Sequence, residues 1–196
     1  QEESYNRSEN IRWGIEKRMQ NGTSLLYNRK CFGYRKNENG TLEICPEEAE
    51  VVRLIFDFYL RGGSILSIIK ELENRQIQTP SGKKKWCTQT VVKILTNEKY
   101  IGNVLLKKTY TDGFPNRKRK NNRGEKDQYL AEQLHPEIIS KEIFDAVQIE
   151  RQRRSNVVID KNGEKKRAGK RYCSKITPET DIESFDSILD YSSYRK

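Results

Sequence analysis

The segment that most constrains the fold runs from Pro46 to Gly63. Proline suits the first helical position, and the acidic residues that follow it meet the positive end of the helix dipole. Apolar residues then recur at helical spacing and form a stripe made of Ala49, Val52, Ile55, Phe56 and Tyr59, widened by Val51 and Phe58. Because Gly62-Gly63 provides a helix stop, the sequence predicts the main core helix here.

Two further helices are predicted after it, joined by a loop. Ser64 suits an N-cap, and apolar residues follow at i, i+3, i+4 and i+7. The loop Ile77–Lys85 precedes a second helix in which Val91, Ile94 and Leu95 form one apolar face. Its other face consists of Thr88, Gln89, Val92, Lys93 and Thr96. This order favours a helix-turn-helix variant with a long connector. Taken alone, the second helix is more typical of an ordinary amphipathic helix with a solvated face, and the surrounding elements and charges reverse that preference.

The remaining patterns add two helices and several short strands. A helix over about residues 1–21 ends at Asn21-Gly22, and Ser140 caps another. Asn39-Gly40 between short alternating runs predicts a hairpin, and residues 103–107 and 128–134 are strand candidates. The predicted fold class is mainly α with small β elements (α+β), with a helix-turn-helix-like domain after a long helix.

The charge of the chain indicates a polyanionic partner. Formal net charge is +10, and no apolar run is long enough to span a membrane. Nucleic acid is therefore favoured over a membrane. Positive charge is densest between Lys107 and Lys126, which we predict to be a loop that contacts phosphates. From about residue 156 the helical pattern fails, and we expect a basic linker followed by an acidic, weakly ordered tail.

The sequence contains few groups suited to catalysis or metal binding. The four cysteines form no CxxC pair, and the only histidine, His135, stands in a predicted turn. We therefore expect reduced thiols, no metal, no cofactor and no catalytic residue in this chain. The predicted function is DNA binding.

Several separate motifs occur in the order found in one family. The chain resembles the large serine recombinases, which include phage integrases, transposon recombinases and sporulation-type recombinases. The resemblance rests on SENIRWGI (8–15), CFGYR (31–35), CPEEAEVVRLIFDFYLRGGS (45–64), IIKELENRQIQTPSGKKKW (68–86), TVVKILTNEKYIGNV (90–104) and HPEIISKEIFDAVQ (135–148).

The resemblance implies a division of the chain and a role for each part. In this family a catalytic domain with a nucleophilic serine leads through a long helix into a DNA-binding recombinase domain, and a zinc ribbon usually follows. Residues 1–22 would be the end of the long helix, 23–155 the recombinase domain, and 156–196 the linker and tail. This sequence contains neither the catalytic serine domain nor a CxxC ribbon after Cys173. We therefore expect it to be inactive alone.

The expected partner is double-stranded DNA carrying an attachment half-site for integration, excision or transposition. The helix at 88–96 would enter the major groove, and the connection around residues 22–30 would follow the minor groove. The candidate DNA-binding residues are Arg29, Lys30, Lys83, Lys84, Lys85, Thr88, Gln89, Val92, Lys93, Thr96, Lys107, Lys108, Arg117, Lys118, Arg119 and Lys120.

Location and assembly follow from the same resemblance. We expect a cytoplasmic, nucleoid-associated protein of a bacterium or phage, monomeric as this chain and a dimer or tetramer at full length. The alternatives are a stand-alone helix-turn-helix transcriptional regulator, and an interaction fragment whose basic face binds an acidic protein.

Overall fold

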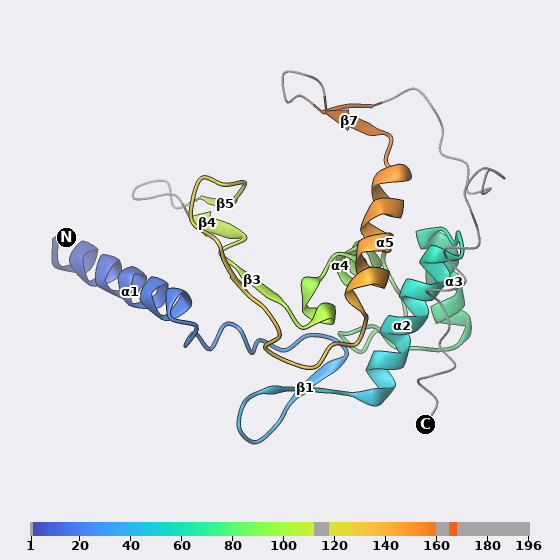
Figure 1. Cartoon of the computed structure of the whole chain (residues 1–196), viewed down its shortest axis with the longest axis horizontal. Coiled ribbons are helices and arrows are strands. Elements are labelled where there is room, and N and C mark those ends of the chain that lie inside the picture. Colours follow the sequence, from blue (N-terminus) through green and yellow to red (C-terminus); the bar gives the residue numbers. More distant parts are fainter. Residues whose placement is uncertain (1, 112–117, 160–164, 168–196) are drawn as a thin grey trace. The chain divides into compact units, whose positions relative to one another are not determined.

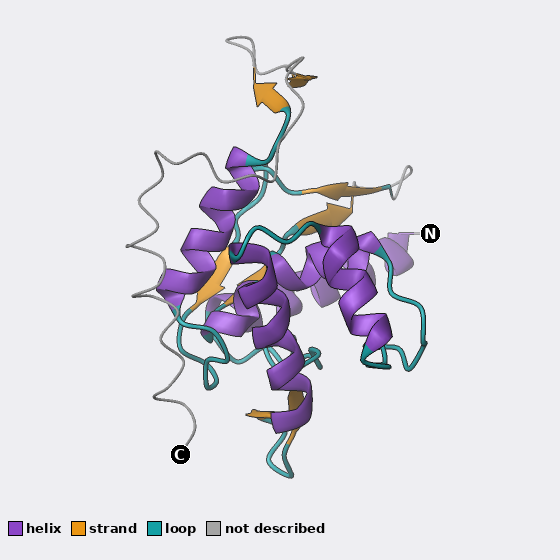
Figure 2. Ribbon diagram, turned by 90° about the vertical axis from the view of Figure 1, so that its right-hand side faces the viewer, coloured by secondary structure: helices purple, strands orange, loops and turns teal. Residues whose placement is uncertain are grey.

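The computed structural model describes residues 2–111, 118–159 and 165–167. It shows mainly helices joined by short two-stranded sheets (Figure 2), which confirms the predicted α+β class. The chain forms two compact units. Among the described residues, one contains residues 2–45, 98–111 and 118–137, and the other contains residues 46–97, 138–159 and 165–167.

The second unit is built from four helices that pack on one another (Figure 1): α2 (Pro46–Leu60), α3 (Ile65–Asn74), α4 (Thr88–Leu95) and α5 (Lys141–Arg153). The predicted stripe of α2 is the centre of its core, with Ala49, Val52, Ile55 and Phe56 fully buried. Each of the other helices adds a narrower apolar face, including Leu72, Leu95 and Val147. Because buried residues recur at helical spacing on all four helices, these helices could be predicted from the sequence pattern.

Several helix ends of this unit are held by side chains from neighbouring residues or from other helices. Ser64 Oγ accepts from the Ser67 amide at 3.1 Å, as the sequence predicted for an N-cap. At the C-terminal end of α2, the Arg154 guanidinium donates to the carbonyls of Gly63 and Tyr59 at 2.7 and 2.8 Å. Gln148 likewise donates to the Leu95 carbonyl at 2.8 Å. Gln148 of α5 and Arg154, the residue directly after α5, therefore satisfy carbonyls at the ends of α4 and α2.

The first unit contains a long helix and three small sheets. Helix α1 spans Glu2–Gln20 and buries only Met19, with Ile11 and Trp13 exposed. The predicted hairpin forms from β1 (Tyr34–Lys36) and β2 (Leu42–Ile44). Strand β3 (Val104–Leu106) pairs with β6 (Tyr129–Ala131), and β4 (Thr109–Thr111) pairs with β5 (Arg119–Asn121), all antiparallel. A 3₁₀ helix, η1 (Glu98–Ile101), precedes β3.

The prediction of a loop over residues 107–126 was wrong at residues 109–111 and 119–121. Strands β4 and β5 form a two-stranded ribbon there. Their residues are mostly exposed and polar, so no apolar alternation marks them in the sequence. A second ribbon, β7 (Val157–Ile159) with β8 (Lys165–Arg167), forms where only a basic linker was expected. The expected acidic tail and Cys173 lie outside the described residues.

Candidate nucleic-acid interface

Helix α4 separates its residues cleanly by burial. Val91, Ile94 and Leu95 are buried against the rest of their unit. The exposed side chains on the opposite face are Thr88, Gln89 and Lys93, while Val92 and Thr96 are half-buried. The Thr96 hydroxyl donates to the Val92 carbonyl at 2.8 Å, so it is already used within the helix end. Three of the five predicted side chains are therefore freely presented by α4.

The connector between α3 and α4 is held by a tryptophan that the sequence analysis did not single out. Trp86 is 6% exposed; its indole N–H donates to the Ile77 carbonyl at 2.8 Å, and its amide donates to Glu73 Oε1 at 3.0 Å. The indole bond joins the two ends of the loop to each other, and the amide bond joins its second end to α3. The sequence did contain a signal for this role, because a large aromatic residue directly before a predicted helix is a candidate for a buried anchor.

The loop itself folds into a turn that exposes its basic residues. Thr79 is buried, and its hydroxyl accepts from the Lys83 amide at 2.9 Å. The Thr79 amide donates to the Lys83 carbonyl, also at 2.9 Å. The side chains of Lys83, Lys84 and Lys85 are all exposed. A run of cations thus leads directly into the exposed face of α4.

The basic ribbon, defined here as Lys118–Lys120 together with β4, carries a second group of predicted residues. Lys118, Arg119 and Lys120 are exposed, and Arg119 Nε donates to Thr109 Oγ1 across the ribbon at 3.0 Å. Lys108 is exposed but pairs with Glu98 at 2.6 Å. Arg117 lies outside the described residues.

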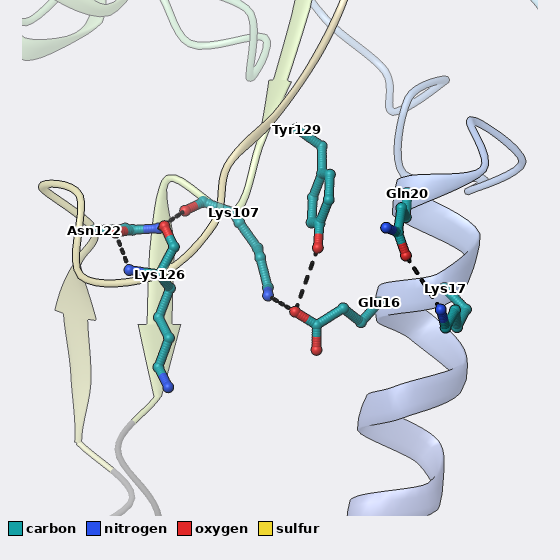
Figure 3. Close-up of polar contacts among 7 residues, drawn as sticks. All are labelled: Glu16, Lys17, Gln20, Lys107, Asn122, Lys126 and Tyr129. Atoms are coloured by element: carbon teal, nitrogen blue, oxygen red, sulfur yellow. Dashed lines mark hydrogen bonds and ion pairs between the residues drawn. The ribbon is translucent and has the colours of Figure 1, made fainter.

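Lys107 points toward Glu16 of α1 (Figure 3). Its ammonium pairs with Glu16 and lies 5.4 Å from the centre of the Tyr129 ring. The Tyr129 hydroxyl also donates to Glu16 at 3.4 Å. The hydrogen bond from Lys107 lowers the pKa of the Glu16 carboxyl below its ordinary value, which favours the carboxylate form. In this arrangement Lys107 is committed to a contact within the unit.

Asn122 fixes the junction at which the chain leaves β3 for the ribbon. It is 8% exposed, and its amide group donates to the carbonyls of Lys107 and Lys126 at 2.9 and 2.7 Å (Figure 3). Its Oδ1 accepts from the amides of Gly124 and Lys126. Lys107 has a positive φ of 56° at this point, a conformation that a non-glycine residue adopts only when its surroundings hold it there. Asn122 supplies that support, and sequence reasoning did not identify it.

The remaining predicted residues, Arg29 and Lys30, stand between α1 and β1 with exposed side chains. The structure therefore groups the candidates by unit. Lys83–Lys85 and the face of α4 belong to the four-helix unit, and Arg29, Lys30, Lys108 and the basic ribbon belong to the other.

Other chemistry in the described residues is sparse. No group of three or more His, Cys, Asp or Glu side chains there could hold a metal ion. None of the described helices combines the length and apolar character of a membrane span. His135 is buried and its Nε2 lies 2.7 Å from the Lys99 carbonyl, a structural contact. Cys87 is exposed at the start of α4.

Comparison with known proteins identifies the family. A family model described as Recombinase matches residues 46–154. A "Putative DNA recombinase" of Bacillus subtilis (strain 168) is 33% identical over 95 residues, an alignment that covers 45% of this chain and 19% of the relative. The chain thus corresponds to a minor part of that protein's length.

Two solved structures are also similar. One is a crystal structure of an LSR–DNA complex, with 26% identity, a TM-score of 0.43, and coverage of 66% of this chain and 34% of that one. The other comes from work on sequence requirements of the Listeria innocua prophage attP site, with 27% identity, a TM-score of 0.42, and coverage of 63% and 42%. Because the Recombinase model matches more than half of the chain, the chain belongs to the Recombinase family, the large serine recombinases that its motif order indicated.

Proposed function

We propose that this chain is a sequence-specific DNA-binding part of a large serine recombinase and recognises an attachment half-site for integration, excision or transposition. The observation that carries the proposal is the face of α4. Thr88, Gln89 and Lys93 are exposed directly after three exposed lysines, while the opposite face is buried. This arrangement lies within residues 46–154, which the family model matches.

The side chains of this face suit base recognition in the major groove. That groove admits an α-helix, and each base pair presents a distinct pattern of donors and acceptors there. Gln89 has the amide geometry that pairs with adenine, and Lys93 has a donor suited to guanine. Val92 could contact only an apolar group, such as a thymine methyl. The buried face holds α4 in place, so the outward side chains are presented in a defined direction.

Other basic residues in the proposal contact phosphates. Lys83–Lys85 at the entry of α4 and Lys118–Lys120 of the basic ribbon are exposed cations, and their positive charge suits contact with phosphates. Arg29 and Lys30 would follow the minor groove from the connection after α1. In this proposal residues 23–155 together act as the DNA-binding domain, and α1 joins it to the catalytic domain of a complete recombinase.

The division of labour in recombination follows from this assignment. Large serine recombinases cleave and rejoin DNA through phosphoserine linkages, and this chain would select the site and position it. We expect the chain to bind duplex DNA as a monomer without cutting it. Nicking accompanied by a covalent serine adduct would contradict this assignment.

The test begins with selection of bound duplexes from a random pool at high salt. Affinity for the selected duplex and for a random duplex is then measured across a salt series. For both, log K should fall with log salt by about 0.9 per phosphate neutralised. An enriched motif together with a steep slope supports the proposal. A flat salt response with no enriched motif would refute it. Lys141→Ala, which removes an exposed charge from the first turn of α5, serves as the control variant.

A further inference from the structure

The connector between α1 and β1, residues 21–30, is held at its start by α1. The Thr23 amide donates to the Arg18 carbonyl at 2.9 Å. Tyr27 is 4% exposed, and its hydroxyl donates to the Met19 carbonyl at 2.9 Å. The connector therefore turns back on the last turn of the helix before it reaches Arg29 and Lys30.

The far end of the connector is held by a lysine from a distant part of the sequence. Lys99 Nζ donates to the Arg29 carbonyl at 2.7 Å and to the Tyr27 carbonyl at 3.2 Å. Burial lowers the pKa of the Lys99 ammonium below its ordinary value, and the nearby Glu98 carboxylate opposes that shift. A partly buried cation requires acceptors, and the two connector carbonyls supply them.

The backbone of Lys99 is itself fixed. Its carbonyl accepts from the Tyr34 hydroxyl at 3.1 Å and lies 2.7 Å from His135 Nε2. Tyr34 is 1% exposed, and its single O–H is shared between the Lys99 carbonyl and the Pro136 carbonyl, the second at 2.8 Å. The ring of His135 meets Tyr34 edge-on, with ring centres 4.8 Å apart. Lys99 thus reaches the connector from a rigid base.

We propose that Lys99 is a positioning residue for DNA binding, which presents Arg29 and Lys30 to the nucleic acid by binding the carbonyls of Tyr27 and Arg29. The Arg29 carbonyl belongs to the peptide plane that joins residues 29 and 30, and the Tyr27 carbonyl belongs to the plane that joins residues 27 and 28, one residue before Arg29. Holding both planes restricts the backbone through Asn28 to Lys30, and with it the directions in which the side chains at 29 and 30 leave the chain. Both side chains are exposed, as a phosphate or groove contact requires. A connector ordered before binding loses less conformational entropy on the DNA. This inference rests on the proposed DNA-binding function.

The competing explanation is that Lys99 only stabilises its unit. The two explanations differ in how Lys99 depends on Arg29 and Lys30. If Lys99 acts through them, its replacement should matter only while they are present. If it acts on the fold alone, its replacement should cost the same affinity in either background.

The experiment is a double-mutant cycle on the whole chain with a random-sequence duplex at low salt. Lys99→Met should weaken binding by about threefold to tenfold, as expected for loss of one phosphate contact. In an Arg29→Ala/Lys30→Ala background the same change should cost less than about twofold. Lys99→Arg, which keeps a cation with several donors, should restore most of the affinity. Lys36→Met, an exposed change in β1, controls for the lost charge.

A second measurement reports on the connector without DNA. Trypsin cleavage after Arg29 and Lys30, followed by mass spectrometry, should be faster in Lys99→Met than in wild type or Lys36→Met. Equal losses of affinity in both backgrounds, or unchanged cleavage, would overturn the proposal. Absence of DNA binding by the wild-type chain would instead refute the proposed function. The cleavage rates would still show whether Lys99 holds the connector in place. If Lys99→Met loses cooperative unfolding, Lys99→Gln takes its place in both measurements.

Discussion

Helix α4 and the basic ribbon present cations in two physically different ways. Three residues of α4 are buried in a four-helix core, so its outward side chains point in directions set by the packing. All three residues of β5 are exposed, and the described ribbon is joined to its unit through the junction at Lys107 and Asn122. A rigid helix face suits base reading, which needs defined geometry. A ribbon attached at its base suits phosphate contact, which needs mainly charge.

The largest effect is expected from loosening the support of α4. Trp86→Ala removes a buried aromatic side chain and its hydrogen bond to Ile77, and should lower the free energy of unfolding by about 3–5 kcal/mol. Urea unfolding followed by circular dichroism measures this change. Leu130→Ala, at a residue 56% exposed in β6, is the matched control and should stay within about 0.5 kcal/mol. Similar losses for the two variants would show that Trp86 does not anchor the connector.

The next effect concerns the base of the ribbon. Asn122→Ala leaves the carbonyls of Lys107 and Lys126 without their donor and should destabilise the ribbon by about 1–3 kcal/mol. Hydrogen exchange of the β4 and β5 amides should become faster, while exchange in α4 stays unchanged. Lys118→Ala is the control, since it alters the ribbon's charge without touching the junction. Faster exchange in both regions would mean that the ribbon and α4 are not separately supported.

The two regions should also differ in what they contribute to binding. Gln89→Ala should reduce discrimination between a selected and a random duplex by about 1–3 kcal/mol. Lys118→Ala with Lys120→Ala should weaken both duplexes alike and reduce the salt slope by about 1.8. Anisotropy titrations at several salt concentrations separate these outcomes. If Gln89→Ala and the Lys118→Ala/Lys120→Ala variant changed binding in the same way, α4 and the basic ribbon would not differ in how they contact DNA.

The smallest effect is a difference in acid sensitivity between the two units. Burial lowers the pKa of His135, the only histidine of the chain, below its ordinary value of 6.5. The unfolded chain therefore binds this proton more readily than the folded one. The contribution of His135 to stability is complete above pH 6.5 and falls as the pH drops toward the folded-state pKa.

Hydrogen exchange between pH 7.5 and about pH 5, above the ordinary carboxylate range, tests this prediction. After correction for intrinsic rates, protection should fall in the unit that contains the ribbon and stay level in α2–α5. His135→Gln should remove the pH dependence. Equal loss of protection in both units would contradict the prediction that His135 makes its own unit more sensitive to acid.

Local chemistry predicted most of the helices and the first hairpin. Ser64 and Ser140 cap α3 and α5, and the Asn39-Gly40 turn joins β1 to β2, because each acts over a few neighbouring residues. The buried face of α4 was predicted for the same reason. The ribbon was missed because its strands alternate no apolar residues, and its start depends on Asn122, which is distant from Lys107 in sequence.

The sequence by itself determined where the helices form, which of their faces pack, and that the exposed surface is strongly basic. Only the tertiary structure decided which basic residues are presented outward. Lys107 pairs with Glu16, Lys108 pairs with Glu98, and Lys99 binds the connector carbonyls, whereas Lys83–Lys85 and Lys93 are exposed. Periodicity is a property of neighbouring residues. The partner of a long, flexible cation is set by contacts between residues far apart in the chain.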